Sequence, residues 1–170
     1  MNEQIRKYVN NELESSLRSW FSGFKRVVIV GIGNSLRKDD FIGIEVVRSL
    51  RNKVSSAVDL IECETVPESF IVPIIELNPS HILIIDAALL NLEPGDARLV
   101  DYKELKEQQV VSTHALPLRI FCQYLLQTTG AGIALLLIQP KDTSFGENLT
   151  KELDDAASLL VELLSGILGE

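Results

Sequence analysis

The sequence predicts an α/β fold, in which helices cover both faces of an open sheet. Strand-like apolar runs alternate along the chain with segments of helical periodicity, which is the order of strand–helix–strand units. Some of these runs are apolar throughout, as strands buried on both faces are; they are Val27–Val30, Ile82–Ile85 and Ile133–Ile138. The 170 residues fit one domain with a substantial core.

Residues 1–24 precede the first strand and have the pattern of an amphipathic helix, which Gly23 is expected to end. Its apolar side chains recur at steps of three or four residues; they are Ile5, Val9, Leu13, Leu17, Trp20 and Phe24. We expect this helix to pack on the rest of the chain, residues 25–170, which forms a single α/β domain. A helix that docks a partner or a second copy is the alternative.

The remaining elements follow in alternation. Pro67 favours the first turn of a helix, where its missing N–H costs little, and Pro94–Gly95 marks a turn before an edge strand. Helices are predicted over Ile42–Lys53, Pro67–Leu77, Ala115–Gln127 and Leu149–Leu168, and further strands over Ala57–Ile61 and Ala97–Val100.

Composition argues against several classes of function. No apolar run reaches the roughly 18 residues that cross a bilayer, and no basic segment leads into a long apolar block as in a signal peptide. The net charge of −8 disfavours nucleic acid and anionic membranes as partners. The two cysteines, Cys63 and Cys122, form no Cys-x-x-Cys pair, so we expect free thiols in a cytoplasmic protein.

The stretch from Val27 to Gly43, VVIVGIGNSLRKDDFIG, is the most informative of the chain. The strand ends in Gly-Ile-Gly-Asn, and the acidic pair Asp39 and Asp40 comes directly before a helical pattern. Nucleotide-binding turns place glycines and backbone N–H groups at this point to hold an anion. Two carboxylates at the same place favour a cation instead.

Ligands of an open α/β sheet bind beyond the carboxyl ends of its strands. The polar residues expected at those ends are Asp40, Glu62, Glu64, Asp86 and His114. Two carboxylates and one imidazole, from Asp40, Asp86 and His114, suit a borderline divalent cation such as nickel, zinc or iron. Three protein ligands would leave coordination positions open for water or for a substrate group.

Each of these residues also has a simpler interpretation. Asp39 and Asp40 could cap the following helix and complement its dipole. Asp86 could be an ordinary polar strand end, and His114 could bond the backbone at a helix entry. The other histidine, His81, precedes its strand and is expected on the surface at the opposite edge of the sheet.

Several familiar chemistries lack their motifs. The sequence contains no His-Glu-x-x-His, no Gly-x-Ser-x-Gly and no phosphate loop ending in Gly-Lys-Ser. Leu36 stands where a dinucleotide-binding fingerprint has its third glycine. Glu62 stands where the ribose-binding acid of that fingerprint would be. Glu62 and Glu64 could also both be solvated surface residues. A nucleotide-binding module therefore stays an alternative, although the sequence contains only half of the dinucleotide-binding fingerprint.

The residues resemble the hydrogenase maturation endopeptidases, which process the large subunit of nickel–iron hydrogenases. The matching segments lie between Arg26 and Pro140, in the family's order and at similar spacing; they are VVIVGIGNSLRKDDFIG, TVPESF, HILIIDAALLNLEPGDARLVD, STHALPL and IALLLIQP. STHALPL is similar to the Ser/Thr-Thr-His-x-x-Pro-Leu of the formate-hydrogenlyase-type members. Phe41 departs from a glycine common in the family, and the helix over residues 1–24 is extra.

The resemblance implies a phosphorylase/hydrolase-like three-layer α/β/α sandwich around a mostly parallel, mixed sheet. It implies an aspartic-type endopeptidase that cuts a C-terminal extension from the large-subunit precursor after nickel insertion. It assigns the nickel contact, and with it the catalytic role, to Asp40, Asp86 and His114. The nickel would be carried by the precursor and would serve as a checkpoint, not as a resident cofactor.

Three functions compete with this interpretation. They are the nucleotide-binding module, an assembly factor that binds precursor or metal without cutting, and a metal-dependent peptidase of free peptides. We expect a monomer that engages its substrate transiently, because no long apolar stripe remains once the helices are packed.

Overall fold

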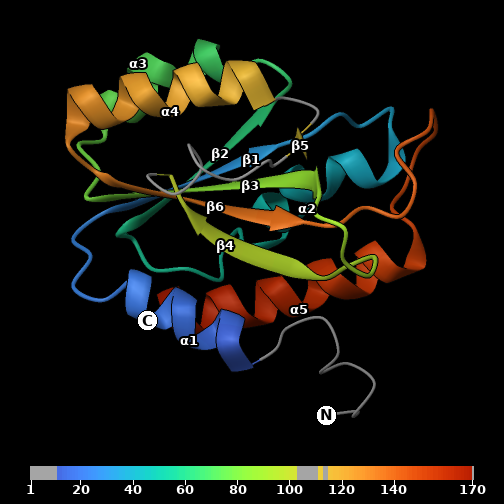
Figure 1. Cartoon of the computed structure of the whole chain (residues 1–170). Helices are drawn as coiled ribbons and strands as arrows, with labels where there is room; N and C mark the ends of the chain where they lie inside the picture. The colour runs from blue at the N-terminus through green and yellow to red at the C-terminus, as the bar shows by residue number, and fades with distance from the viewer. Residues whose placement is uncertain (1–10, 103–110, 113–114, 170) are drawn as a thin grey trace.

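The computed structural model describes residues 11–102, 111–112 and 115–169. Its centre is the mixed, mostly parallel sheet that was predicted, and its strand order is β2-β1-β3-β6-β4 (Figure 1). Strand β1 pairs in parallel with β2 and β3, β3 pairs in parallel with β6, and β4 runs antiparallel to β6 at one edge. The short β5 lies off this path and pairs antiparallel with the end of β3. The strands are β1 Val27–Ile32, β2 Val58–Glu64, β3 His81–Leu89, β4 Ala97–Asp101, β5 Val111–Ser112 and β6 Gly132–Ile138.

Helices cover both faces of the sheet, which gives the three layers that were expected. Helices α3 and α4 lie above the sheet in Figure 1, and α1 and α5 lie below it. Each face has its own apolar core: Ile29 and Leu83 face the α1, α2 and α5 side, whereas Val30 and Ile84 face the α3 and α4 side. The helices are α1 Asn11–Trp20, α2 Ile42–Ser49, α3 Ile71–Glu76, α4 Ala115–Thr129 and α5 Lys151–Leu168.

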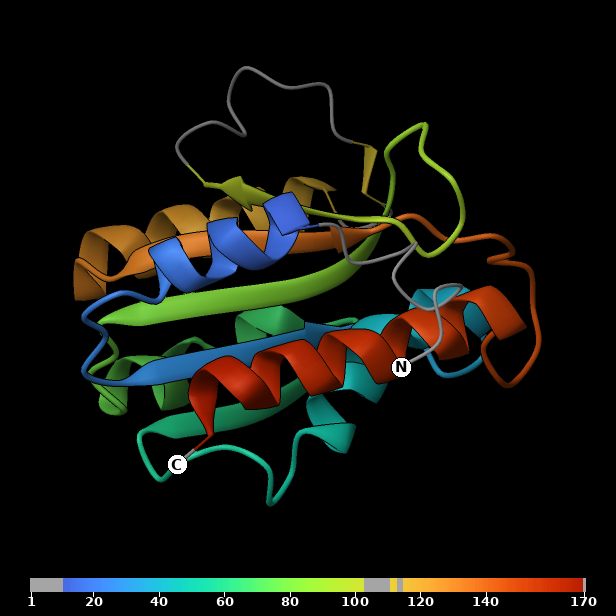
Figure 2. The same ribbon diagram turned by 90° about the horizontal axis from the view of Figure 1, so that it is seen from below.

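The described part of the N-terminal helix packs on the sheet. Leu13 and Leu17 of α1 are buried in the core that the helix shares with α2 and α5, and α1 lies next to β4 (Figure 2). A turn follows Trp20, and Gly23 has a φ of 73°, the left-handed conformation that favours glycine after a helix. Residues 1–10 of the predicted helix lie outside the described residues.

Three predictions about local structure are wrong. Strand β3 continues past Asp86 to Leu89 because it pairs with β6, so Asp86 lies opposite Leu137 within the strand and not at its end. Strand β2 likewise includes Glu62 and Glu64, which were expected to follow it. The helix predicted over residues 67–77 begins as a 3₁₀ turn, η3 Pro67–Phe70, before α3.

His81 is less exposed than expected. It begins β3 at the amino edge of the sheet, as predicted, but it is partly buried because the ring of Trp20 contacts its ring edge-on at a centroid distance of 5.0 Å. Desolvation by this packing lowers the pKa of His81, against a backbone hydrogen bond at Trp20 that raises it. None of the helices in the described ranges combines the length and the hydropathy that a bilayer crossing requires.

Candidate active site at the carboxyl edge of the sheet

The chain turns sharply at the carboxyl end of β1. After Ile32 it passes through residues 33–37 into η2, a 3₁₀ turn over Lys38–Phe41, and then directly into α2. Figure 1 shows α2, β5 and the tips of β1 and β3 at the same end of the sheet. The topology therefore brings the acidic pair of η2 to the edge where α/β folds bind their ligands.

Two glycines allow this turn to pack closely on the strands. A Cβ on Gly33 would lie 2.2 Å from the carbonyl oxygen of Asp40. A Cβ on Gly43 would lie 2.2 Å from the carbonyl oxygen of Ile85 and 2.3 Å from that of Ile32. Because any side chain at either position would collide with backbone, these contacts fix η2 and the start of α2 against the ends of β1 and β3.

Asp40 and Asp86 lie at this edge and are both buried, with 2% and 0% of their surface exposed. Asp86 directly follows Ile85, which touches Gly43, and η2 packs against β3. One oxygen of Asp86, Oδ1, accepts a hydrogen bond of 2.9 Å from the backbone N–H of Ala87. Asp86 lies inside β3, but it comes one residue after Ile85, the last residue of β3 that pairs with β1, and so lies at the carboxyl edge on the β1 side.

Among the described residues, the buried polar side chains are concentrated at this edge of the sheet. They are Asp39, Asp40, Asp86 and Gln139. Burying carboxylates costs free energy unless they are paired or hydrogen-bonded, so proteins bury them mainly where structure or function requires them. No other part of the described chain carries such a group.

Asp39 has a different role from its neighbour Asp40. Its Oδ1 accepts a hydrogen bond of 2.7 Å from the backbone N–H of Thr150, and its Oδ2 accepts one of 3.0 Å from the hydroxyl of Thr150. Oδ2 also accepts from the backbone N–H groups of Lys141 and Asp142, at 2.9 and 2.8 Å. Asp39 therefore binds the connection between β6 and α5, residues 139–150.

The capping role suggested for Asp39 at α2 is wrong. Phe41 is the N-cap of α2, its side chain makes no capping hydrogen bond, and the carboxylate of Asp39 is bound by the 139–150 connection. Asp39 instead caps a helix that begins more than a hundred residues later: Thr150 is the N-cap of α5, and its backbone N–H donates to Asp39. A negative charge at this end of α5 is also favoured by the helix dipole.

Further contacts join the residues around η2 to the 139–150 connection. The backbone N–H of Lys38 donates to the carbonyl of Gly146 at 2.9 Å, and the Nε of Arg37 donates to the carbonyl of Thr143 at 3.1 Å. The Nζ of Lys38 forms an ion pair with Asp142. Hydrogen bonds from Lys38 and then from Ser144 hold the pKa of the Asp142 carboxyl well below its usual range.

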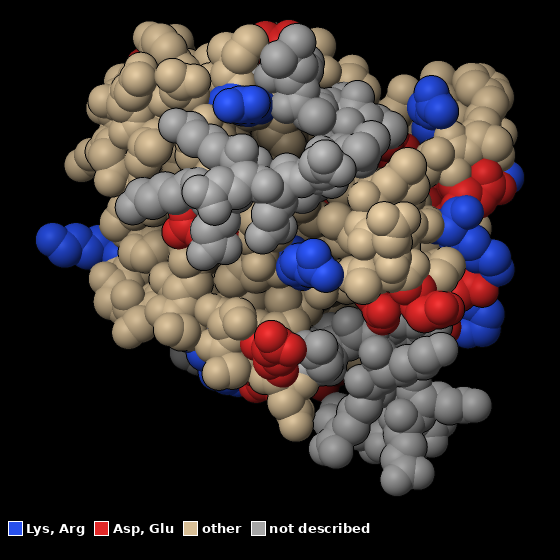
Figure 3. All heavy atoms as spheres, in the orientation of Figure 1, with Lys and Arg blue, Asp and Glu red and all other residues tan. Residues whose placement is uncertain are grey.

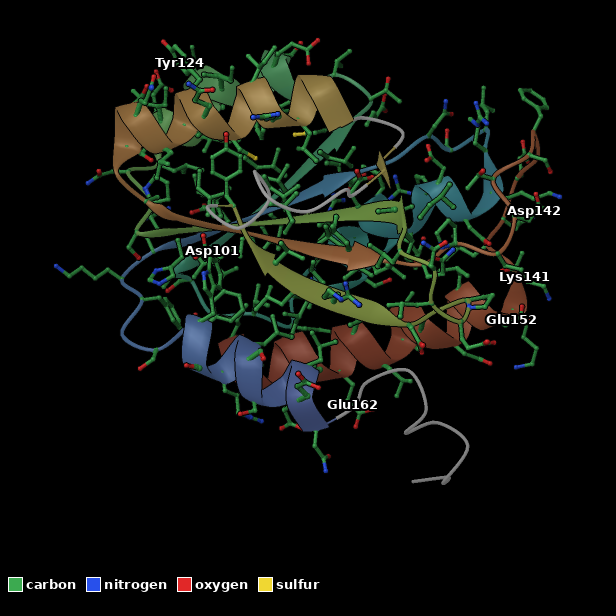
Figure 4. The ribbon with its side chains drawn as sticks, in the orientation of Figure 1. Asp101, Tyr124, Lys141, Asp142, Glu152 and Glu162 are labelled. Carbon is green, nitrogen blue, oxygen red and sulfur yellow. The ribbon has the colours of Figure 1, made fainter. Side chains whose placement is uncertain are left out.

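The surface at this end of the molecule carries paired charges. Lys141 forms an ion pair of 2.6 Å with Glu152 on the first turn of α5. Figure 4 shows Lys141, Asp142 and Glu152 close together where the sheet meets α5, and Figure 3 shows acidic and basic side chains interleaved on the same side. These exposed pairs orient the 139–150 connection but contribute little to stability individually.

Gln139 is a residue of this edge that the sequence reasoning missed. It directly follows β6, and its Oε1 accepts hydrogen bonds from the backbone N–H groups of Leu90, at 2.7 Å, and Leu92, at 3.4 Å. Its Nε2 donates to the carbonyl of Pro140 at 3.0 Å. Its place at the carboxyl end of an apolar strand is the signal that could have indicated it. Gln139 orders the segment that follows β3.

Glu62 does not belong to the buried group. It lies on β2, and its carboxylate forms ion pairs of 2.8 Å with Arg48 on α2 and of 2.5 Å with Arg51 in the turn after α2. It is therefore neither simply solvated nor free to bind a ribose, which weakens the nucleotide-binding alternative. Glu64 is exposed.

The predicted third ligand, His114, lies outside the described residues. Within the described ranges, no three His, Cys, Asp or Glu side chains are grouped as metal ligands would be. A cavity of about 280 Å³ lies near the start of β6, lined by residues 101–102, Leu126 and residues 130–133, and is thus at the other end of β6 from Gln139.

Comparisons with known proteins agree with the motifs and the fold. Residues 44–167 match the family model described as hydrogenase maturation protease. A putative hydrogenase maturation protease of Methanocaldococcus jannaschii is 36% identical over 155 residues, covering 82% of this chain and 89% of the relative. The hydrogenase 3 maturation protease of Escherichia coli is 30% identical over 139 residues, covering 82% and 88%. The crystal structure of a nickel–iron hydrogenase maturation protease, HycI, from Thermococcus kodakarensis superposes with a TM-score of 0.84 and 35% identity, covering 91% of this chain and 99% of that one.

Proposed function

Because this chain belongs to the hydrogenase maturation protease family, we propose that it cuts the C-terminal extension from a nickel–iron hydrogenase large-subunit precursor once nickel is inserted. Its endopeptidase activity and the large subunit as its substrate follow from the family. The finer part of the proposal is that the enzyme recognises the inserted nickel itself. In this proposal, the side chains of Asp40, Asp86 and His114 contact that nickel.

The observation that carries the proposal is the burial of Asp40 and Asp86 at the carboxyl edge of the sheet. Buried carboxylates are costly unless their charge is compensated, and a bound cation is one group that compensates it. The close packing at Gly33 and Gly43 fixes the backbone that carries Asp40. Asp39, whose two oxygens are already occupied by protein donors, is not available to the metal.

The pairing of β5 supports His114 as the third contact. Val111 pairs with Leu89 and Ser112 pairs with Ala88 in an antiparallel register. Strand β5 therefore brings Ser112, which precedes His114 by two residues in the sequence, beside Ala88, which follows Asp86 by two residues. An imidazole beside two carboxylates is a donor set that nickel accepts.

In this mechanism, nickel arrives as part of the substrate. The three side chains complete the coordination of nickel that the precursor already holds, so that only a loaded precursor is gripped with its C-terminal extension in position for attack. Either the nickel or one of the two carboxylates, acting as general base, activates the attacking water. We expect the enzyme to work as a cytoplasmic monomer that binds the precursor transiently.

Phe41 fits this mechanism although the family commonly has glycine there. The guanidinium of Arg48 lies over the Phe41 ring, 5.2 Å from its centroid, so that α2 holds the ring. We expect the ring to narrow the approach to the neighbouring Asp40 without removing a ligand.

An assembly factor that binds precursor without cutting it would show no cleavage in the test below.

The test compares Asp40→Asn and Asp86→Asn with the wild-type enzyme on nickel-loaded precursor, with intact-mass detection of the released peptide. Each variant is expected to lose at least about 10²-fold in rate, the usual contribution of a positioned catalytic group. Asp59→Asn is the matched control. Asp59 lies on β2 and forms an ion pair with Arg26, which directly precedes β1, so this pair is at the amino end of β1. Normal processing by Asp40→Asn would refute the assignment of the site.

A further inference from the structure

The carboxylate of Asp39 ties η2, the single turn that also carries Asp40, to the 139–150 connection. Its four hydrogen bonds all come from the 139–150 connection, and its own backbone N–H donates to the carbonyl of Asp142 at 3.2 Å. Hydrogen bonds to an ionised acceptor are stronger than those between neutral groups. The side chain is fully buried, so water does not compete for these donors.

We propose that Asp39 is a positioning residue, which locks η2 to the 139–150 connection and thereby sets the place of Asp40. This inference rests on the proposed role of Asp40 in contacting the nickel of the precursor. It divides the acidic pair between two tasks: Asp39 acts on the protein, and Asp40 acts on the substrate.

The packing around Asp40 shows why such a lock is needed. On one side, the Asp40 carbonyl lies against Gly33, where even a methyl group would collide with it. That contact and the close packing at Gly43 hold η2 against the strands. Since η2 is a single turn without a side-chain cap of its own, the side-chain bonds of Asp39, together with the backbone bond from Lys38 to Gly146, also tie it to the 139–150 connection.

An asparagine cannot replace Asp39 in this role. Both oxygens of the carboxylate accept hydrogen bonds from N–H groups, Oδ1 from Thr150 and Oδ2 from Lys141 and Asp142. The amide nitrogen of asparagine would face one of these sets of donors in either orientation and would leave buried donors unpaired. Asp39→Asn is therefore expected to release η2 although it is nearly isosteric.

The experiment uses two lock variants and a matched control. Thr150→Val removes only the hydroxyl donor and keeps the backbone N–H of the lock. Ser80→Ala is the matched control, because it also removes a hydroxyl that forms tertiary hydrogen bonds. Ser80 bonds the backbone of Lys25 and Arg26 near the amino ends of β1 and β3. The full-length proteins are compared for melting temperature, for processing rate per folded enzyme, and for inhibition by nickel-free precursor.

The proposed lock predicts that the lock variants process precursor more slowly than the change in their melting temperature explains. Asp39→Asn should process loaded precursor about 10²-fold more slowly, as a misplacement of about 1 Å can do. Thr150→Val should lose about fivefold, the typical worth of one hydrogen bond. Ser80→Ala should lower the melting temperature but keep the wild-type rate. The inhibition constant of nickel-free precursor should be unchanged in all three, because the lock acts through the nickel contact.

The outcomes separate this inference from the proposed function. If Asp40→Asn loses activity while Asp39→Asn and Thr150→Val keep the wild-type rate, the lock is refuted and the site stands. If Asp39→Asn does not fold, the same comparison is made with Thr150→Val alone. If wild type and Asp40→Asn process equally, the proposed site fails and the lock fails with it.

Discussion

The α-carbon of Gly43 lies against the carbonyl oxygen of Ile85, so close that a Cβ at Gly43 would be 2.2 Å from it. The contact joins the first turn of α2 to β3. These two elements are separated in the sequence by β2, η3 and α3 but meet at the carboxyl edge of the sheet. Asp40 precedes Gly43 on one side of this contact, and Asp86 follows Ile85 on the other. The glycine therefore sets how closely the two backbone segments that carry these buried aspartates pack.

Gly43→Ala is expected to destabilise the protein and to impair processing. The added methyl group would collide with backbone oxygens of both β1 and β3, so that α2 has to move away from the sheet. Overpacking of this kind costs about 1–3 kcal/mol of unfolding free energy. Chemical denaturation measures the loss, and the processing rate per folded enzyme reports the shift of Asp40 relative to Asp86.

Gly166→Ala is the matched control for that substitution. Gly166 lies inside α5, and apart from its chain neighbours and the backbone of its own helix, no heavy atom lies within 4 Å of the position of its added Cβ. An alanine there should stabilise the helix by about 0.5–1 kcal/mol. If Gly43→Ala were as harmless as Gly166→Ala, the close approach of α2 to β3 would not exist in solution.

Leu17→Ala tests whether α1 is part of the core. Leu17 is fully buried, in the cluster that α1 shares with α2 and α5. Its truncation should cost about 3 kcal/mol of unfolding free energy through lost burial and a residual cavity. The neighbouring Arg18→Ala removes an exposed ion pair with Glu14 and should change stability very little. Equal, small effects of both changes would mean that α1 is a docking element instead.

The two buried thiols predict how stability changes at alkaline pH. Desolvation raises the pKa of Cys63 and of Cys122 from 9.0 to about 12. Because the folded state keeps these protons while the unfolded state releases them, the stabilisation is complete below pH 9 and is lost as pH rises from 9 toward 12. The loss is about 1.4 kcal/mol per thiol and pH unit.

Denaturation curves between pH 8 and pH 11 measure this slope. A variant with alanine at both cysteines should show a shallower dependence on pH than the wild type over that range. In the native protein at pH 8, a thiol reagent should label neither cysteine until the protein unfolds. Rapid labelling of Cys63 or Cys122 under native conditions would contradict their burial.

Apolar periodicity was enough to predict most of the fold, because buried parallel strands such as residues 133–138 are apolar throughout. It also predicted that Asp40 and Asp86 reach one edge of the sheet. The end of β3 was misplaced because Asp86 is a charged residue inside a strand, and only its pairing with β6 shows that the strand continues. A pattern of single residues carries no information about such pairing.

The distinction between Asp39 and Asp40 lies beyond what the sequence alone can show. Adjacent aspartates look alike in sequence, and their different roles arise from donors on Lys141, Asp142 and Thr150, which are far away along the chain. The same holds for Gln139, whose partners at Leu90 and Leu92 come from another connection. These are tertiary hydrogen bonds, which no local pattern encodes.

The most direct test of the nickel-gated protease is to incubate the wild-type enzyme with large-subunit precursor, with and without inserted nickel, and to follow intact mass. The account predicts that a defined C-terminal peptide is released only from the nickel-loaded precursor. Release at the same rate without nickel would contradict the checkpoint, and binding of loaded precursor without any release would contradict its cleavage by this enzyme.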